Sequence, residues 1–314
     1  MNILVTGGSG FIGSNLVELL LNKTKVEKVI NVDCLTYASS KTNDREFHDN
    51  PKYFFERIDI RETRAIIDVI NRFRVDNVFH LAAESHVDNS INNPFPFVQS
   101  NCVGTMSVLE ASRVTGIKKF INVSTDEVYG ALGEEGKFSE NSPIDPSSPY
   151  SSTKASADLI VASYVKTHSF PAITTRCSNN YGPKQHVEKF IPKVINNIYY
   201  DEKIPVYGDG KNIRDWIYVG DHCRALWKIF TSGETGEVYN IGANTEKTNL
   251  QIIQQICRLM KVKSKDHIDF VTDRLGHDYR YAIDNSKLRN LGWESMYNFS
   301  QGIKKTVNWY IDKF

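Results

Sequence analysis

Asp126 and Glu127 are adjacent carboxyl residues that follow the apolar segment 119–123 and the hydroxyl residues Ser124 and Thr125. Acid-base chemistry needs one group that takes a proton and one that gives a proton. Two neighbouring carboxyl groups can divide these roles, because like charges push their pKa values apart. An acidic pair after a strand is also common in a solvated turn. The pair therefore indicates chemistry only together with its surroundings.

Tyr150 and Lys154 form a second reactive pair at the start of segment 151–168, which has a helical pattern. Residues four apart lie on one face of a helix. A free phenol has a pKa of about 10, so a tyrosine acts as a base near neutral pH only where a positive charge favours the phenolate. Lys154 could supply that charge. A chance tyrosine-lysine spacing is the alternative.

Residues 6–13, Thr-Gly-Gly-Ser-Gly-Phe-Ile-Gly, join the apolar run 3–5 to a helical pattern. Glycines three residues apart allow a tight turn and the close approach of a pyrophosphate to the N–H groups of a helix start. The next apolar run, 29–32, ends at Asp33, where a carboxylate can accept from both ribose hydroxyls and would repel a 2′-phosphate. The pattern predicts NAD rather than NADP. An ordinary strand-end aspartate is the alternative.

Strand and helix patterns alternate along the first half of the chain. The predicted strands are 3–5, 29–32, 53–57, 77–81, 119–123 and 171–176, and the predicted helices include 62–73, 95–114 and 151–168. This alternation predicts an α/β fold with a doubly wound parallel sheet, a Rossmann fold, whose carboxyl edge carries the ligand-binding loops. Residues 130–149 are polar and rich in Gly, Ser and Pro, which indicates a mobile loop over the cleft or, alternatively, a disordered linker.

The alternation becomes irregular after residue 180, so we expect a smaller α/β domain interleaved with the first. The predicted NAD-binding domain comprises residues 1–180 and 214–243. The predicted substrate-binding domain comprises residues 181–213 and 244–314.

Composition excludes several classes of protein. The chain has 314 residues, with 38 Lys plus Arg against 37 Asp plus Glu, so no strong field attracts nucleic acid or an anionic membrane. Five scattered cysteines without a C-x-x-C spacing indicate neither a disulfide framework nor a metal site. With no apolar run long enough for a membrane span and no signal-peptide pattern after Met1, we expect a cytoplasmic protein.

Several motifs together resemble the extended short-chain dehydrogenase/reductase family and, within it, the nucleotide-sugar 4,6-dehydratases, above all those that act on dTDP-glucose. These motifs are T-G-G-S-G-F-I-G-S at 6–14, H-L-A-A-E-S-H-V-D at 80–88, S-T-D-E-V-Y-G at 124–130, S-P-Y-S-S-T-K at 148–154, R-C-S-N-N-Y-G-P at 176–183, P-V-Y-G-D-G at 205–210, R-D-W at 214–216 and D-R-L-G-H-D at 273–278. Related 4-epimerases carry small or hydroxyl residues in place of Asp126 and Glu127, so this pair distinguishes the dehydratases.

The resemblance implies a reaction in three steps on a nucleotide-diphosphate glucose. Tyr150 takes the proton of the C4 hydroxyl while hydride leaves for NAD, with Thr125 bonded to the same oxygen and Lys154 supporting the phenolate. Glu127 then removes the C5 proton, and Asp126 protonates the departing C6 hydroxyl. Return of the hydride to C6 and reprotonation of C5 give a 4-keto-6-deoxy sugar and restore NAD. The long helices starting near residues 95 and 151 would pair in a homodimer.

The resemblance also implies two sets of contacts. The expected cofactor contacts are Gly7, Gly10, Phe11, Ile12, Gly13, Asp33, Leu35, Thr36, Asp59, Ile60, Leu81, Ala82, Ala83, Ser85, Tyr150, Lys154 and Asn180. The expected substrate contacts are Ser85, Thr125, Asn179, Lys189, Phe190, Ile191, Pro205, Val206, Tyr207, Arg214, Asn249, Arg274 and His277.

The chain departs from the usual dTDP-glucose pattern at Lys184-Gln185-His186-Val187, Asn89, Cys34 and Leu275. The first and last departures lie in segments expected to hold the nucleotide, so UDP-glucose or a UDP-amino sugar stays open as the substrate. A UDP-sugar 4-epimerase or decarboxylase is an alternative enzyme of the same fold. A non-catalytic NAD-binding scaffold is the alternative from another class.

Overall fold

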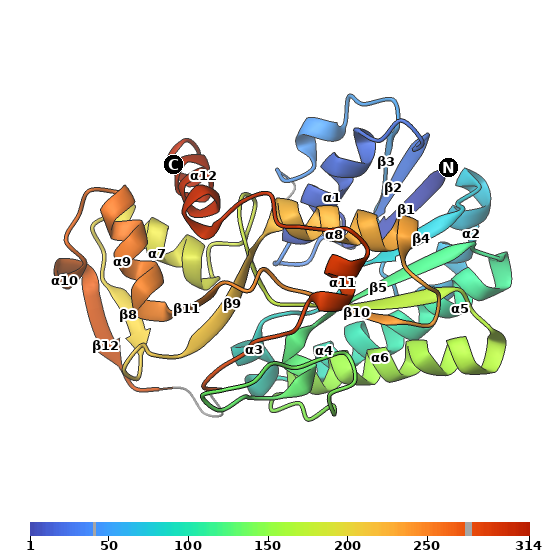
Figure 1. Cartoon of the computed structure of the whole chain (residues 1–314). Helices are drawn as coiled ribbons and strands as arrows, with labels where there is room; N and C mark the ends of the chain where they lie inside the picture. The colour runs from blue at the N-terminus through green and yellow to red at the C-terminus, as the bar shows by residue number, and fades with distance from the viewer. Residues whose placement is uncertain (40–41, 274–277) are drawn as a thin grey trace.

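The computed structural model describes residues 1–39, 42–273 and 278–314. The expected contacts from Arg274 and His277 lie outside the described residues. Seven strands from the described segments form one sheet in the order β10-β6-β5-β4-β1-β2-β3, and every neighbouring pair is parallel (Figure 1). These strands are β1 Asn2–Thr6, β2 Lys28–Val32, β3 Tyr53–Glu56, β4 Asn77–His80, β5 Lys119–Thr125, β6 Ala172–Cys177 and β10 Val238–Ile241. The predicted doubly wound parallel sheet is confirmed.

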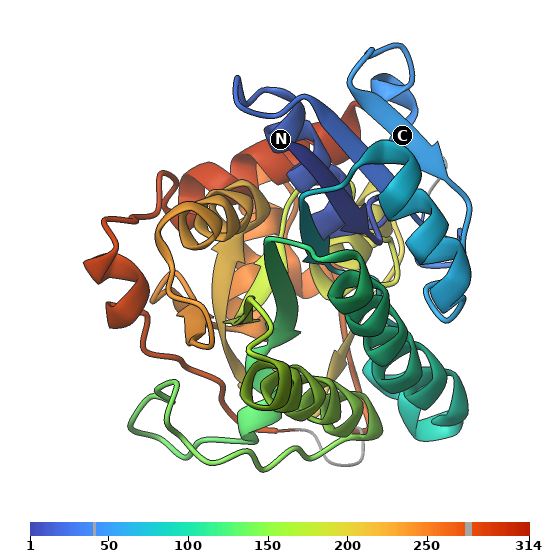
Figure 2. The same cartoon turned by 90° about the vertical axis from the view of Figure 1, so that its right-hand side faces the viewer.

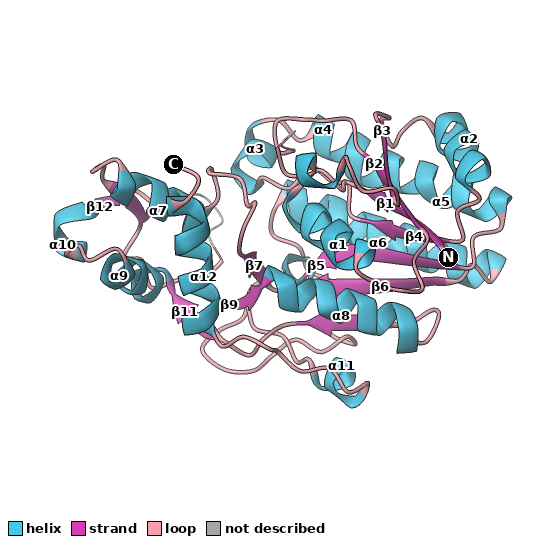
Figure 3. Cartoon of the chain, turned by 90° about the horizontal axis from the view of Figure 1, so that it is seen from above, coloured by secondary structure: helices cyan, strands magenta, loops and turns pink. Residues whose placement is uncertain are grey.

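Helices cover both faces of this sheet, as the view from above shows (Figure 3). One face packs against α1 Phe11–Leu21, α8 Val219–Ser232 and α11 Ser286–Asn290; the other packs against α2 Thr63–Phe73, α5 Thr105–Thr115 and α6 Pro149–His168. The central strands are apolar on both sides because both faces are covered. Ile3, Leu4 and Val5 in β1 are completely buried.

The predicted helix 95–114 is divided in the structure. It consists of α4 Phe95–Phe97, a π-helical segment η2 Val98–Gly104, and α5. The helix α3 Val87–Asn92 precedes it. Gly104 lies against the side chain of Ile60, and a Cβ at this glycine would come within 2.5 Å of that side chain.

The small lobe is the second body of the fold, at the left of Figure 1. It contains a three-stranded sheet in the order β11-β9-β7 and a two-stranded sheet of β12 and β8. Its strands are β7 Asn179–Tyr181, β8 Ile204–Tyr207, β9 Ile213–Tyr218, β11 Glu246–Thr248 and β12 Ile268–Val271; its helices are α7 Phe190–Tyr199, α9 Asn249–Leu259, α10 Ser264–His267 and α12 Phe299–Ile311. Its separate apolar core includes Ile195, Trp216 and Ile253.

The chain passes between the two bodies more than once. After β9 it returns to the large sheet through α8 and β10, and after the small lobe it returns again through α11. Leu288 and Trp293 belong to the core of the large sheet. The prediction from sequence assigns both, within residues 244–314, to the substrate-binding domain. No helix of the described residues combines the length and apolarity needed to cross a membrane.

Candidate active site

A cavity of about 690 Å³ lies at the carboxyl edge of the large sheet and reaches the start of the small lobe. All five predicted catalytic residues line it: Thr125, Asp126, Glu127, Tyr150 and Lys154. Every predicted cofactor contact lines it except Leu35. Four predicted substrate contacts also line it: Ser85, Thr125, Asn179 and Lys189. The loops of the parallel sheet therefore bring the catalytic and cofactor candidates into one space.

The glycine turn is packed too closely for larger residues. Gly7 has a φ of +72°, and a Cβ there would lie 2.8 Å from the backbone of Ala82. A Cβ at Gly13 would lie 2.0 Å from the carbonyl oxygen of Gly7. Helix α1 begins directly after this turn, and a helix leaves the N–H groups of its first turn unpaired. This cradle fits the pyrophosphate of a dinucleotide.

Asp33 connects the glycine turn to the loop after β2. Its carboxylate accepts from the backbone N–H of Ser9 at 3.1 Å and from that of Leu35 at 2.8 Å. The side chain is buried at the cavity wall, and burial raises its pKa above the usual value. Leu35 has a φ of +61°, and its backbone shapes this loop while its neighbours Cys34 and Thr36 line the cavity. The position of Asp33 suits a ribose diol beside the turn.

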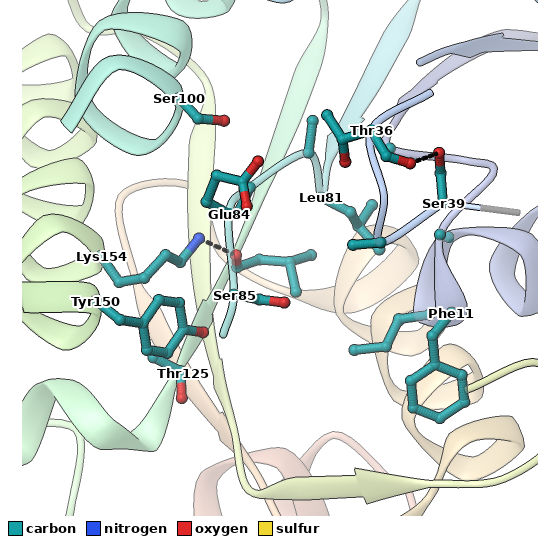
Figure 4. Close-up of a pocket in the computed structure, with 18 of the residues that line it drawn as sticks. Phe11, Thr36, Ser39, Leu81, Glu84, Ser85, Ser100, Thr125, Tyr150 and Lys154 are labelled. Atoms are coloured by element: carbon teal, nitrogen blue, oxygen red, sulfur yellow. Dashed lines mark hydrogen bonds between the residues drawn. The ribbon is translucent and has the colours of Figure 1, made fainter. Parts of the chain in front are cut away.

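Tyr150 and Lys154 project from the first turns of α6 toward the end of β5 (Figure 4). A capping box between Ser148 and Ser151 starts this helix. Lys154 Nζ donates to the carbonyl oxygen of Val123 at 2.8 Å, and the phenol of Tyr150 lies beside the side chain of Thr125. Burial raises the pKa of Tyr150 and lowers that of Lys154. A phenolate here therefore needs further positive charge from a bound group.

Asp126 and Glu127 begin the 3-10 turn η3 Asp126–Tyr129, directly after β5. Thr125 caps this turn, because its hydroxyl accepts from the N–H of Glu127 at 3.3 Å. Asp126 is buried, and its Oδ2 has no hydrogen-bond partner among the described residues. Burial, followed by the charge of Glu127, raises the pKa of Asp126 well above its usual value. Glu127 is only partly buried. Burial therefore favours the protonated form of Asp126.

Residues 4–306 match the family described as GDP-mannose 4,6-dehydratase. The chain belongs to this family. It is 46% identical to a dTDP-glucose 4,6-dehydratase of Haemophilus influenzae, covering 99% of this chain and 98% of the relative.

Two solved structures are similar to this member of the family. The dTDP-glucose 4,6-dehydratase of Bacillus anthracis, in complex with NAD, has a TM-score of 0.93 and 47% identity, covering 99% of this chain and 97% of that one. The dTDP-glucose 4,6-dehydratase of Streptomyces venezuelae, with NAD and thymidine diphosphate bound, has a TM-score of 0.96 and 38% identity, with the same coverage.

A buried ion pair supports helix α6, which carries Tyr150 and Lys154. Arg176 Nε on β6 lies 2.9 Å from Asp158 Oδ2, and Asn122 donates to the other carboxylate oxygen at 3.1 Å. The Arg176 guanidinium also stacks on the ring of Tyr129, 4.7 Å from its centroid. The sequence does not predict this pair, although Asp158 stands four residues after Lys154 on the same helical face. These contacts tie α6 to β6 and to β5, the strand that ends at Thr125.

The predicted substrate contacts of the small lobe lie mostly outside the cavity. Arg214 is buried in β9, donates to the carbonyl oxygens of Asp278 and Tyr279 at 2.9 and 3.3 Å, and stacks on Tyr281. Lys189 Nζ lines the cavity and donates to the carbonyl oxygen of Ser85 at 2.9 Å. The remaining described candidates do not line the cavity; they are Phe190, Ile191, Pro205, Val206, Tyr207 and Asn249. The role of this set stays a prediction.

Sequence reasoning missed part of the cavity wall. Glu84 is half-buried between two predicted cofactor contacts, and burial raises its pKa. Gln99 and Ser100 reach the cavity from the π-helical segment, for which the sequence has no signal. The predicted loop 130–149 does not line the cavity; instead Leu132 pairs with Arg280 beside it. Among the described residues, no group of His, Cys, Asp or Glu side chains is arranged to hold a metal ion.

Proposed function

We propose that this protein is an NAD-dependent hydro-lyase that converts dTDP-glucose to dTDP-4-keto-6-deoxyglucose. The observation that carries the proposal is the position of Asp126 and Glu127 in the same cavity as the Tyr150-Thr125 pair. An epimerase needs only the second pair, whereas loss of water needs an additional acid and base. The family match and the dTDP-glucose 4,6-dehydratases at 46% and 47% identity support this choice.

The first task of the site is to deprotonate the C4 hydroxyl of the glucose. When bound, NAD would accept a hydride from C4 and later return it to C6. Tyr150 takes the hydroxyl proton, and Thr125, whose side chain lies beside the phenol, holds the same oxygen. Lys154 places an ammonium group one helical turn away on the same helix, which favours the phenolate.

The second task is the elimination of water between C5 and C6. A carbonyl at C4 acidifies the proton on C5, and Glu127 is the base that removes it. Asp126 keeps its proton because it is buried beside another carboxylate, so it can give that proton to the leaving C6 hydroxyl. Each carboxyl group thus has the environment that its role requires.

The cradle at the glycine turn, with Asp33 at its side, is the proposed cofactor site. Because the cofactor is restored in every cycle, the enzyme has no need to release it. We expect NAD to remain with the purified protein. Arg214, Asn179 and Lys189 are the proposed contacts for the diphosphate and sugar.

Glu127→Gln separates oxidation at C4 from elimination. The variant should still oxidise C4, seen as the absorbance of bound NADH on mixing with dTDP-glucose, but it should form the 4-keto-6-deoxy product roughly 10²- to 10⁴-fold more slowly. Product is followed by its alkaline absorbance and by mass. Glu135→Gln, at an exposed loop position outside the cavity, is the matched control. Product formation at the normal rate in Glu127→Gln would refute the assigned base.

The nucleotide is tested with purified protein and four substrates, dTDP-glucose, UDP-glucose, GDP-mannose and UDP-N-acetylglucosamine. We expect the highest kcat/KM for dTDP-glucose, with a product lighter by one water. An isomer of equal mass would indicate a 4-epimerase instead. Inert behaviour toward all four, with NAD bound, would favour a non-catalytic scaffold.

We further propose that the protein is a homodimer, joined through the helices η2, α5 and α6. Figure 2 shows the helix that ends in α5 (teal to green) beside α6 (yellow-green), on the same side of the molecule. Exposed apolar side chains lie on these elements, among them Val98, Val103, Met106 and Leu159, and Phe95 on the preceding α4 is also exposed. Exposed large apolar side chains on neighbouring helices are typical of an interface. Two copies of this face would form a four-helix contact.

The dimer is tested with the double variant Met106→Glu and Leu159→Glu. Light scattering should show a dimer for the native protein and a monomer for the variant. Met296→Glu, at an even more exposed methionine on another part of the chain, is the control and should remain dimeric. A native monomer at micromolar concentration would contradict the proposal.

We also propose a cytoplasmic location. All five cysteines of the chain are free thiols in the structure, and three of them are buried. Reduced thiols are typical of that compartment. Fractionation of the source cells, followed by detection with an antibody, is the direct measurement.

A further inference from the structure

A series of buried hydrogen bonds begins at His222, which does not itself line the cavity. His222 belongs to α8 and is fully buried. Its Nδ1 lies 2.8 Å from Asn180 Oδ1 in β7. Asn180 Nδ2 is 3.0 Å from the carbonyl oxygen of Ser178 and 3.4 Å from Cys177 Sγ. Cys177 Sγ in turn lies 3.4 Å from the carbonyl oxygen of Ser124 in β5. Four separate elements are connected.

The chemistry of these groups determines which atom donates at each step. The carbonyl oxygen of Ser178 can only accept, so the nitrogen of the Asn180 amide must face it. The amide oxygen therefore faces His222, and because that oxygen can only accept, His222 Nδ1 carries a proton. Burial lowers the pKa of His222 to about 3, so the ring is neutral and its Nε2 is unprotonated. This Nε2 has no hydrogen-bond partner among the described residues.

Cys177 extends the series in the same direction. The carbonyl oxygen of Ser124 can only accept, so the thiol donates to it, and the sulfur accepts from Asn180. Burial raises the pKa of the Cys177 thiol to about 12, so this donor keeps its proton. The hydrogen bonds run from His222 through Asn180 and Cys177 to Ser124. Ser124 immediately precedes Thr125 and Asp126.

We propose that His222 is a positioning residue for the dehydratase reaction, acting through Asn180 and Cys177 to hold the end of β5 that carries the catalytic turn. This inference rests on the proposed function. The same amide closes the turn between β6 and β7, where Asn179 meets the cavity. Because the amide oxygen and nitrogen of Asn180 are already committed to protein partners, we assign this side chain to positioning. Small displacements of catalytic groups are costly, since a misplacement of about 1 Å can reduce rates about 10²-fold.

The first experiment identifies the tautomer in the unsubstituted holoenzyme. Nitrogen-15 NMR of histidine-labelled protein, with the signal assigned by its loss in His222→Gln, should show a neutral ring protonated at Nδ1. It should not titrate between about pH 5 and pH 8, in contrast to a free histidine. A ring protonated at Nε2, or one that titrates in this range, overturns the proposal.

The second experiment compares a variant that keeps the donor with one that removes it. His222→Gln retains an N–H for Asn180, whereas His222→Leu does not. We expect kcat to fall roughly 10- to 100-fold in His222→Leu with KM changed less than about threefold, and to recover largely in His222→Gln. Equal losses in both variants, or no loss in His222→Leu, contradict the proposal.

A third comparison tests the series at Cys177 and leaves His222 unchanged. Cys177→Ser keeps a group that both donates and accepts, and Cys177→Ala ends the series. The alanine variant should lose about tenfold in kcat and the serine variant less. Cys223→Ala, at a buried cysteine next to His222, is the matched control and should retain kcat. A loss in Cys223→Ala equal to that in Cys177→Ala overturns the proposal.

The NMR result is independent of catalysis. If no nucleotide sugar reacts while His222 shows the Nδ1–H tautomer, the proposed function fails and the hydrogen-bond geometry stands. If the substrate reacts but the tautomer is the other one, the positioning role fails and the proposed function stands.

Discussion

The carboxyl edge of the large sheet and the face of the small lobe hold their polar side chains differently. At the sheet edge, Thr125, Asp126 and Lys154 are all buried and bonded to neighbouring groups of β5 or its turn. In the small lobe, Arg214 donates to main-chain carbonyls of the segment after β12, and Tyr207 is 39% exposed. The sheet edge is therefore arranged before any ligand arrives. The small lobe has contacts that a ligand must add to or replace.

This difference corresponds to two tasks. Chemical steps require groups whose geometry is set in advance, because reorganisation during the reaction costs rate. Recognition of a nucleotide requires charges and rings that can adapt as the ligand binds. Substitutions at the sheet edge should therefore reduce kcat, and substitutions in the small lobe should raise KM.

Among substitutions at the sheet edge and in the small lobe, Tyr150→Phe should have the largest effect on activity. Without the phenol no group takes the C4 proton, so kcat should fall roughly 10²- to 10⁴-fold. Rapid mixing with dTDP-glucose should show no absorbance of bound NADH. Tyr200→Phe, at an exposed tyrosine of the small lobe, is the control. Bound NADH forming at the normal rate in Tyr150→Phe would show that another group is the base.

Arg214→Leu should have the largest effect in the small lobe. Loss of a charged donor to the diphosphate should raise KM for the nucleotide sugar roughly 10- to 100-fold, with kcat changed less than about threefold. Steady-state kinetics on dTDP-glucose measure both. Arg258→Leu, an exposed arginine of α9, should leave both constants unchanged. If kcat instead fell 10- to 100-fold at constant KM, Arg214 would belong with the catalytic groups. The two regions would then not differ in the kinetic constant that they control.

The sheet edge could be predicted from the sequence in detail. In a parallel sheet, every loop that follows a strand reaches the same edge, so the order of strands in the chain locates Asp59, Ala82 and Thr125 near one another. The glycine spacing and Asp33 predicted NAD as the cofactor. These features are local in sequence, which is why motifs and periodicity can identify them.

Long-range contacts could not be predicted in this way. The pairing of Asp158 with Arg176 joins a helix to a strand, and the bonds from His222 to Asn180 and Cys177 join three elements. Periodicity carries no signal for the partner of a buried polar side chain. The strands of the small lobe are short, and β8 and β12 pair across 60 residues of intervening chain. The sequence therefore indicated a second domain but not the order and pairing of its strands.

The smallest expected effect is on the free energy of unfolding, which should depend on pH because Asp126 is buried at the sheet edge. The pKa of Asp126 is raised in the folded protein, mainly by burial, whereas an unfolded aspartate has a pKa of about 3.9. Between these two values the folded state keeps a proton that the unfolded state has lost. Stability should therefore fall as the pH rises through this window, with a slope of up to about 1.4 kcal/mol per pH unit.

Asp126→Asn removes this dependence, because an amide does not titrate. The variant should gain stability relative to the native protein as the pH rises, measured by urea unfolding at a series of pH values. Asp284→Asn gives the contrast: hydrogen bonds from Ser286 lower the pKa of Asp284, so its stabilisation is complete above the unfolded pKa and is lost only as the pH falls. A difference between Asp126→Asn and the native protein that stays constant with pH would mean that the buried carboxyl group is ionised. The sheet edge would then lack the proton donor that distinguishes it from the small lobe.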